Sequence, residues 1–135
     1  MLGREKIERI KALLEKREEI DAAYLYGSQA RGNEHTDSDI DIGLLLKEEF
    51  KPPARYPVRL ALKIEKHTGL ENVDLRILNG KNPRFLQNVL TDSRLIFSKS
   101  EEHRIDFEST SLVRYLDMKP VFEERKKMMK RRISE

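Results

Sequence analysis

Cysteine is absent from this chain of 135 residues, which excludes disulfide bonds and thiolate metal sites. No long apolar run occurs, and the first residues, MLGREKIERI, lack the apolar core of a secretory signal peptide. We therefore expect a cytoplasmic protein without a membrane segment. The net charge is only +3, and no basic patch is interleaved with aromatic residues, so nucleic acid is not a favoured partner.

The residues that are present indicate one folded domain. Hydrophobic and charged residues each make up 38% of the chain, and the apolar residues fall into periodic segments, which argues against disorder. Apolar positions at helical spacing predict a helix over 4–20, with Ile20 on its buried face. Strands are expected at 22–27, 39–46, 71–78 and 94–98, with helices at 57–69 and 82–93.

The last third of the chain is expected to be helical. A helix beginning at Glu101 should end or kink at Pro120, and a further helix should follow. We divide the chain into a domain over 1–100 and a C-terminal helical segment over 101–135, which packs on the domain or on a partner. The alternation of elements predicts an α+β (α/β-like) fold with a helix-covered sheet. We expect core positions on one face of the C-terminal helices, with contact to a partner as the alternative: Leu112, Tyr115, Leu116, Val121 and Phe122.

Two aspartates stand in the sequence DIDIGLLL, which otherwise has the character of a buried strand. Residues at i and i+2 of a strand point to the same face, so Asp39 and Asp41 should point together while Ile40 and Ile42 enter the core. Two adjacent carboxylates repel each other, and a divalent cation such as Mg²⁺ or Mn²⁺ removes that conflict. Asp74 would join them if the strand at 71–78 pairs beside this one.

These carboxylates also have a purely structural interpretation. Asp39 would then cap the start of the strand, and Asp41 would pair with a basic neighbour. Arg76 shares a strand face with Asp74, and it either contacts the site or pairs with that carboxylate. Tyr24 and Tyr26 are expected to be packing residues.

A glycine–serine turn precedes the aspartates. Gly27 ends a strand and Ser28 can cap a short helix, an arrangement that presents backbone N–H groups to an anion. Glycine lets a phosphate approach the backbone, and Arg31 lies one turn further on, where it can neutralise phosphate charge. No GK[ST] follows, so this is not a Walker A loop. A plain turn and a solvated arginine are the alternatives.

Taken together, Gly27-Ser28, ten intervening residues and Asp39-Ile40-Asp41 resemble the nucleotidyltransferase signature of the DNA polymerase β superfamily. The stretch GSQARGNEHTDSDIDIGLLL is similar to that of its minimal nucleotidyltransferases, the MNT-domain proteins. Asp74 falls where this family has its third carboxylate. The tail RYLDMKPVFEERKKMMKRR is similar to the C-terminal segment of MNT antitoxins that pair with HEPN-domain toxins.

The resemblance implies a mixed sheet covered by helices and an active site that binds ATP and Mg²⁺ or Mn²⁺. In it Gly27 and Ser28 hold the triphosphate, Asp39 and Asp41 ligate metal, and Asp74 binds the catalytic metal or activates the acceptor; the position of Arg31 adds it as a further nucleotide contact. Such antitoxins transfer AMP from ATP to a tyrosine of the partner HEPN ribonuclease. The alternatives are a non-catalytic module that masks the toxin, or transfer to a small molecule or to nucleic acid.

Overall fold

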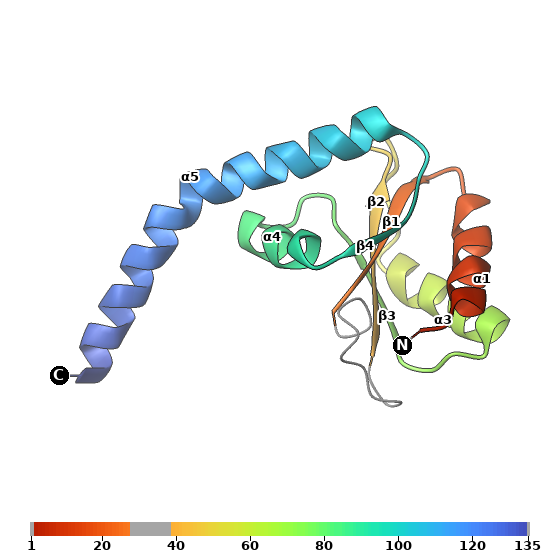
Figure 1. Ribbon diagram of the computed structural model, residues 1–135, viewed down its shortest axis with the longest axis horizontal. Coiled ribbons are helices and arrows are strands. Elements are labelled where there is room, and N and C mark those ends of the chain that lie inside the picture. The colour runs from red at the N-terminus through yellow and green to blue at the C-terminus, as the bar shows by residue number, and fades with distance from the viewer. Residues whose placement is uncertain (1, 28–38, 135) are drawn as a thin grey trace.

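A four-stranded sheet forms the centre of the computed structural model, which describes residues 2–27 and 39–134 (Figure 1). The strand order is β3–β2–β1–β4. β2 and β3 run parallel, whereas β1 is antiparallel to both β2 and β4, so the sheet is mixed as expected. The strands are β1 (Ile20–Tyr26), β2 (Ile40–Leu46), β3 (Val73–Ile77) and β4 (Arg94–Ser98).

Helices cover both faces of the sheet. The described helices are α1 (Arg4–Glu15), α3 (Tyr56–Thr68), α4 (Pro83–Thr91) and α5 (Glu101–Ser134). α1 and α3 lie on one side, while α4 and the beginning of α5 lie on the other (Figure 1). The side covered by α1 and α3 buries the larger apolar cluster, which includes Ile10, Leu14, Leu25, Ile42, Leu44, Leu60 and Ile64. The other side buries a smaller cluster: Ala22, Tyr24, Leu45, Leu78, Leu86 and Val89.

The helix boundaries follow local chemistry that is visible in the sequence. The Asn82 side chain accepts a hydrogen bond of 2.8 Å from the amide of Phe85, which caps the start of α4. At the end of α3, Gly69 adopts a φ of +75°, a conformation that glycine tolerates best. Its amide donates a 2.8 Å hydrogen bond to the carbonyl of Glu65. The start of α4 and the end of α3 therefore lie where the sequence predicted them.

The prediction that the first helix carries Ile20 on its buried face was wrong. α1 ends at Glu15, and a turn follows in which the amide of Ile20 donates to the carbonyl of Arg17. Ile20 instead begins β1, pairs with Leu46 of β2 and is fully buried. A buried isoleucine fits either a helix or a strand, so its burial alone did not distinguish the two.

The C-terminal region is one helix, not two. α5 continues through Pro120, which lacks the N–H that the helix interior requires, and Figure 1 shows the helix change direction near its middle. The change of direction expected at Pro120 is present, but the separate helix expected after it is not. Leu112, Leu116 and Val121 are 44%, 54% and 42% exposed, so the prediction that they are core residues was wrong. Much of the helix extends beyond the sheet (Figure 1), so the sheet does not cover this face along its whole length.

No helix in the described ranges has both the length and the apolar character needed to cross a membrane.

Candidate active site

Three polar side chains form a row across neighbouring strands. Tyr26 of β1 pairs directly with Asp41 of β2, and Asp41 pairs directly with Asp74 of β3. Directly paired residues point to the same face of a sheet and lie about 5 Å apart. The structure therefore brings Asp41 and Asp74 side by side, as the strand pattern predicted. Asp39 is exposed and lies immediately before the first residue of β2.

The row lies on the face of the sheet opposite the larger core. Ile40 and Ile42 belong to the cluster beneath α1 and α3, and alternation along β2 places Asp41 on the other side. Further along this side, Leu45 of β2 packs with Leu78 and with residues of α4. The same face of β2 is thus apolar at one end and acidic at the other.

Gly27 directly adjoins the Asp41 carboxylate. Its φ is +73°, a region that side-chain-bearing residues rarely adopt. A Cβ atom at this position would lie 3.3 Å from Cγ of Asp41 and would overlap with its Oδ2. Glycine is therefore required here by both backbone conformation and space. The two sequence-predicted residues meet in space although they are fourteen positions apart in the chain.

Arg76 is held between the site and α4. Its Nε donates to Oδ2 of Asp74 over 3.3 Å, and both side chains are about half-exposed. Its guanidinium carbon lies 5.7 Å from the centre of the Phe85 ring, a cation–π distance. Of the two roles expected for Arg76, pairing with the Asp74 carboxylate is the one observed.

Tyr26 is the third member of this row, although its sequence context predicted only a packing residue. Burial foremost, and then the negative charges of Asp41 and Asp74 against the opposing charge of Arg76, raise the pKa of its hydroxyl to about 12. The hydroxyl is therefore a hydrogen-bond donor at neutral pH. Only the β1–β2 register brings Tyr26 beside Asp41, and no local sequence signal reveals that pairing.

The donor atoms at this site suit a hard divalent cation. Carboxylate oxygens are the ligands that Mg²⁺ and Mn²⁺ prefer, and Asp41 and Asp74 provide them at adjacent positions. Within residues 2–27 and 39–134, no three acidic, histidine or cysteine side chains lie close enough together to hold a metal as they stand. Asp74 is instead oriented towards Arg76. Ser28 and Arg31, the other predicted nucleotide contacts, lie outside the described residues.

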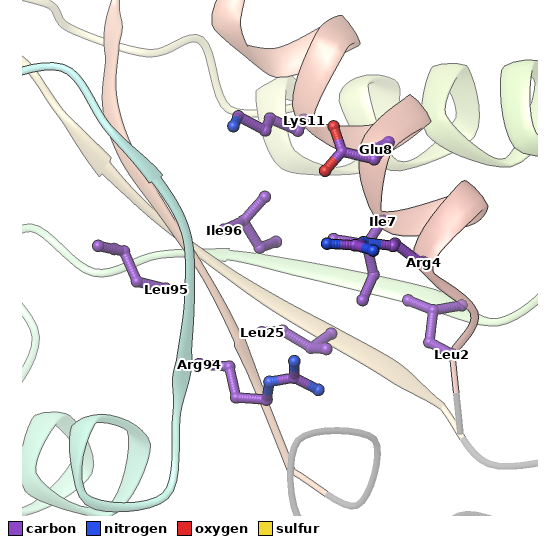
Figure 2. A pocket seen from close by; sticks show the side chains of 9 residues that line it. All are labelled: Leu2, Arg4, Ile7, Glu8, Lys11, Leu25, Arg94, Leu95 and Ile96. Carbon is purple, nitrogen blue, oxygen red and sulfur yellow. The ribbon is translucent and has the colours of Figure 1, made fainter.

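A separate pocket lies between α1 and β4 (Figure 2). Its volume is about 490 Å³, and apolar side chains such as Leu25 and Ile96 share it with the cations Arg4, Lys11 and Arg94. Leu25 packs in the larger core, on the face away from Asp41. None of the predicted site residues lines this pocket, so cavity volume does not identify the candidate active site.

Comparison with known proteins identifies a family for most of the chain. The sequence profile of the family described as "Polymerase beta, Nucleotidyltransferase" matches residues 8–102. A curated relative is the protein adenylyltransferase MntA of Shewanella oneidensis, which is 26% identical over 96 residues. That alignment covers 71% of this chain and 67% of the relative.

Solved structures share the whole fold, including the C-terminal helix. A toxin–antitoxin crystal structure with AMP-PNP contains a chain that superposes with a TM-score of 0.74 at 22% identity, covering 98% of this chain and 99% of that chain. A complex of tri-AMPylated Shewanella oneidensis HEPN toxin with MNT antitoxin gives a TM-score of 0.72 at 20% identity, covering 96% and 98%. At these identities the likeness establishes the fold alone.

Proposed function

Because the chain belongs to the polymerase β nucleotidyltransferase family, we propose that it transfers AMP from ATP to a tyrosine hydroxyl of a partner HEPN ribonuclease and thereby neutralises that toxin. The observation that carries the proposal is the direct pairing of Asp41 with Asp74 beside Gly27. The named activity of the MntA relative and the AMPylated toxin in the related complex support AMP as the transferred group and a HEPN protein as the acceptor.

In this proposal Asp39, Asp41 and Asp74 hold Mg²⁺ or Mn²⁺. When bound, the metal would neutralise triphosphate charge and make the acceptor hydroxyl more acidic. Asp74 must turn away from Arg76 to take part, and because both side chains are about half-exposed, breaking this pair costs little. Arg76 then carries an uncompensated positive charge beside the phosphates.

The transfer is an in-line displacement. The acceptor tyrosine oxygen forms a bond to the α-phosphorus of ATP, and the bond from that phosphorus to the oxygen bridging to the β-phosphate breaks. Pyrophosphate leaves, and the phenolic proton passes to the Asp74 carboxylate. Tyr26, whose pKa is raised to about 12, stays protonated and donates to a phosphate oxygen. Gly27 leaves room for the triphosphate, which Ser28 and Arg31 also contact.

The domain division belongs to the same proposal. Residues 1–100 form the nucleotidyltransferase domain, and residues 101–135 form a helical segment that packs on the domain or on the partner. Because both substrates are intracellular, the proposal also locates the protein in the cytoplasm.

The test is transfer of label from nucleotide to protein. Purified chain, Mg²⁺ and ATP, GTP, CTP or UTP labelled at the α-phosphate are mixed in turn with a purified HEPN ribonuclease from the same cell. We expect label from ATP alone on the HEPN protein, and none with Asp39→Asn. Glu18→Gln is the matched control, since Glu18 is exposed and lies in the turn before β1, at the opposite end of the sheet. Label on RNA or on a small molecule would identify a different acceptor.

The non-catalytic alternative retains support from α5, whose exposed apolar side chains suit protein binding. The non-catalytic and the enzymatic alternatives predict different ribonuclease inhibition by a catalytically inactive chain. A chain with Asp39→Asn and Asp41→Asn would still silence the ribonuclease if masking were sufficient. Full ribonuclease inhibition by this variant would therefore reject catalysis as the neutralising step.

A further inference from the structure

A row of cations along α3 lacks ion-pair partners. Arg55 directly precedes the helix, and Arg59 and Lys63 follow at four-residue spacing, so the three lie on one side of it, about 6 Å apart along its axis. All three are exposed, and none of the described residues forms an ion pair with any of them. Like charges at this spacing repel each other and destabilise the helix.

The charge of this stretch is not balanced within its own sequence. Residues 51–64 hold four cations and no carboxylate, which leaves 23 cations against 24 carboxylates in the rest of the chain. On α1, by contrast, Arg9 pairs with Glu5 at 2.9 Å and Lys11 pairs with Glu15 at 3.7 Å. The chain thus balances the cations of one surface helix internally and leaves those of α3 for an external anion.

The row borders a pocket of about 580 Å³ at the start of α3. Its lining combines apolar side chains, among them Pro53, Leu60 and Leu62, with four cations: Arg17, Arg55, Arg59 and Lys63. No carboxylate among the described residues lines it. The pocket in Figure 2 differs in this respect because it includes Glu8, and the groove along α5 includes Glu123.

Arg17, in the turn before β1, is held in place beside this pocket. Its Nε donates to Oε2 of Glu19 over 2.8 Å, and its guanidinium carbon lies 5.6 Å from the centre of the Tyr56 ring. The Tyr56 hydroxyl donates to the same carboxylate oxygen over 2.7 Å. These contacts join the turn before β1 to the first turn of α3, so this wall of the pocket is already formed without a ligand.

From the row of cations and the pocket beside it, we propose that this side of α3 binds a polyphosphate anion. Guanidinium and ammonium groups are strong donors to phosphate oxygens, and successive phosphates can occupy successive cations. The cations supply the counter-charge themselves, because the pocket offers no carboxylate to ligate a metal ion. A nucleobase would cover the apolar lining, whereas an inorganic chain would leave it exposed.

This site is separate from the candidate active site. α3 covers the face of the sheet opposite Asp41 (Figure 1). Arg17 precedes β1 and Tyr26 ends it, and a strand of seven residues spans about 20 Å. An anion bound at α3 therefore does not reach the carboxylate row, and the inference does not depend on AMP transfer.

A nucleic acid strand also carries phosphates, but it fits this site less well. The three unpaired cations extend over only about 12 Å of helix, which suits a chain of a few phosphates. Proteins that bind single strands follow the backbone over a longer positively charged groove and stack bases on aromatic faces. Here the Tyr56 ring is buried, with the guanidinium of Arg17 above it.

The test measures metal-free anion binding by the full chain. An Asp41→Asn background in EDTA suppresses metal-dependent binding at the candidate active site. ATP, AMP and inorganic tripolyphosphate are each titrated by calorimetry. Arg55→Gln, Arg59→Gln and Lys63→Gln together remove the row, and we expect them to raise Kd for ATP and for tripolyphosphate at least about tenfold. AMP, with one phosphate, should bind the parent far more weakly than ATP does.

The matched control removes the same charge from another exposed helix surface. Lys119→Gln, Arg125→Gln and Lys126→Gln lie together on α5 and should leave both Kd values unchanged. Equal losses in the control and in the α3 variant would show attraction by net charge alone and would overturn the proposal. Failure of the parent to bind either polyphosphate in EDTA would also overturn it.

The remaining outcomes identify the source of the anion. Tighter binding of ATP than of tripolyphosphate would assign the pocket to nucleoside polyphosphates, and equal binding would assign it to inorganic polyphosphate. A labelled oligouridine that binds the parent but not the α3 variant, in the absence of tripolyphosphate binding, would overturn the proposal in favour of nucleic acid. If no AMP transfer to a HEPN protein is found but the α3 variant alone loses polyphosphate binding, this inference stands and the proposed function fails.

Discussion

The two faces of β2 have different roles over the same few residues. On one face Ile40, Ile42 and Leu44 are buried beneath α1 and α3. On the other, Asp41 lies between Tyr26 and Asp74. Apolar burial stabilises the strand, so the adjacent carboxylates are placed accurately although they repel each other. We therefore expect substitutions on one face to change stability and those on the other to change activity.

The largest expected effect is on the acidic face. Asp41→Asn removes a metal-binding oxygen charge, so AMP transfer should fall by about 100-fold or more. The free energy of unfolding should stay within about 1 kcal/mol of the parent, because the change relieves repulsion with Asp74. Initial rates and urea unfolding measure the two quantities. A variant with parental activity would remove Asp41 from the site.

The next residue along the strand should behave in the opposite way. Ile42 is fully buried, so Ile42→Ala should lower the free energy of unfolding by about 2–5 kcal/mol. Activity per folded molecule should be retained at temperatures well below the transition. Leu62→Ala, at a position that is 58% exposed on α3, is the control and should change stability by less than about 0.5 kcal/mol. Equal losses in both variants would contradict the assigned core.

Substitution of Gly27 should affect both activity and stability, each to an intermediate extent. Gly27→Ala imposes a strained φ of +73° and pushes the Asp41 carboxylate aside, so both stability and transfer should decrease. Gly80→Ala provides a matched control, since Gly80 has a φ of +75° but no neighbouring atom within 4 Å of where its Cβ would lie. Each should lose about 1–2 kcal/mol from backbone strain. Only Gly27→Ala should also lose activity, and parental activity there would contradict the contact with Asp41.

The smallest expected effect concerns Tyr26 at high pH. Its folded pKa of about 12 lies above the value of about 10 expected in the unfolded chain, so folding favours the protonated hydroxyl. This contribution to stability is fully present below pH 10 and is lost as pH rises towards 12. Burial also raises the pKa of Tyr24 and Tyr56, so several tyrosines act in the same direction. Tyr26→Phe should show a shallower loss of stability in urea unfolding between pH 9 and 11, and an unchanged slope would contradict the shift.

Much of the fold follows from local pattern. Alternation over 39–42 predicted that Ile40 and Ile42 enter the core, because successive strand residues point to opposite faces. The Asn82 cap and the glycine after α3 marked helix ends, because each satisfies a local backbone requirement. Ile20 was misassigned because its burial suits both a helix and a strand. The face of α5 with Leu112, Leu116 and Val121 was wrongly predicted to be core, because an apolar stripe on a helix does not reveal which surface, if any, packs against it.

The order of amino acids was enough to identify the types of chemical group at the candidate site and their spacing along the chain. It was also enough to show that Asp41 and Ile42 point to opposite faces, since this depends on the geometry of one strand alone. Tertiary packing was needed to place β2 between β1 and β3, which brings Tyr26, Asp41 and Asp74 into one row. It was also needed to show that α5 extends beyond the sheet. Strand register and helix docking depend on contacts between segments distant in the chain, and no local pattern encodes them.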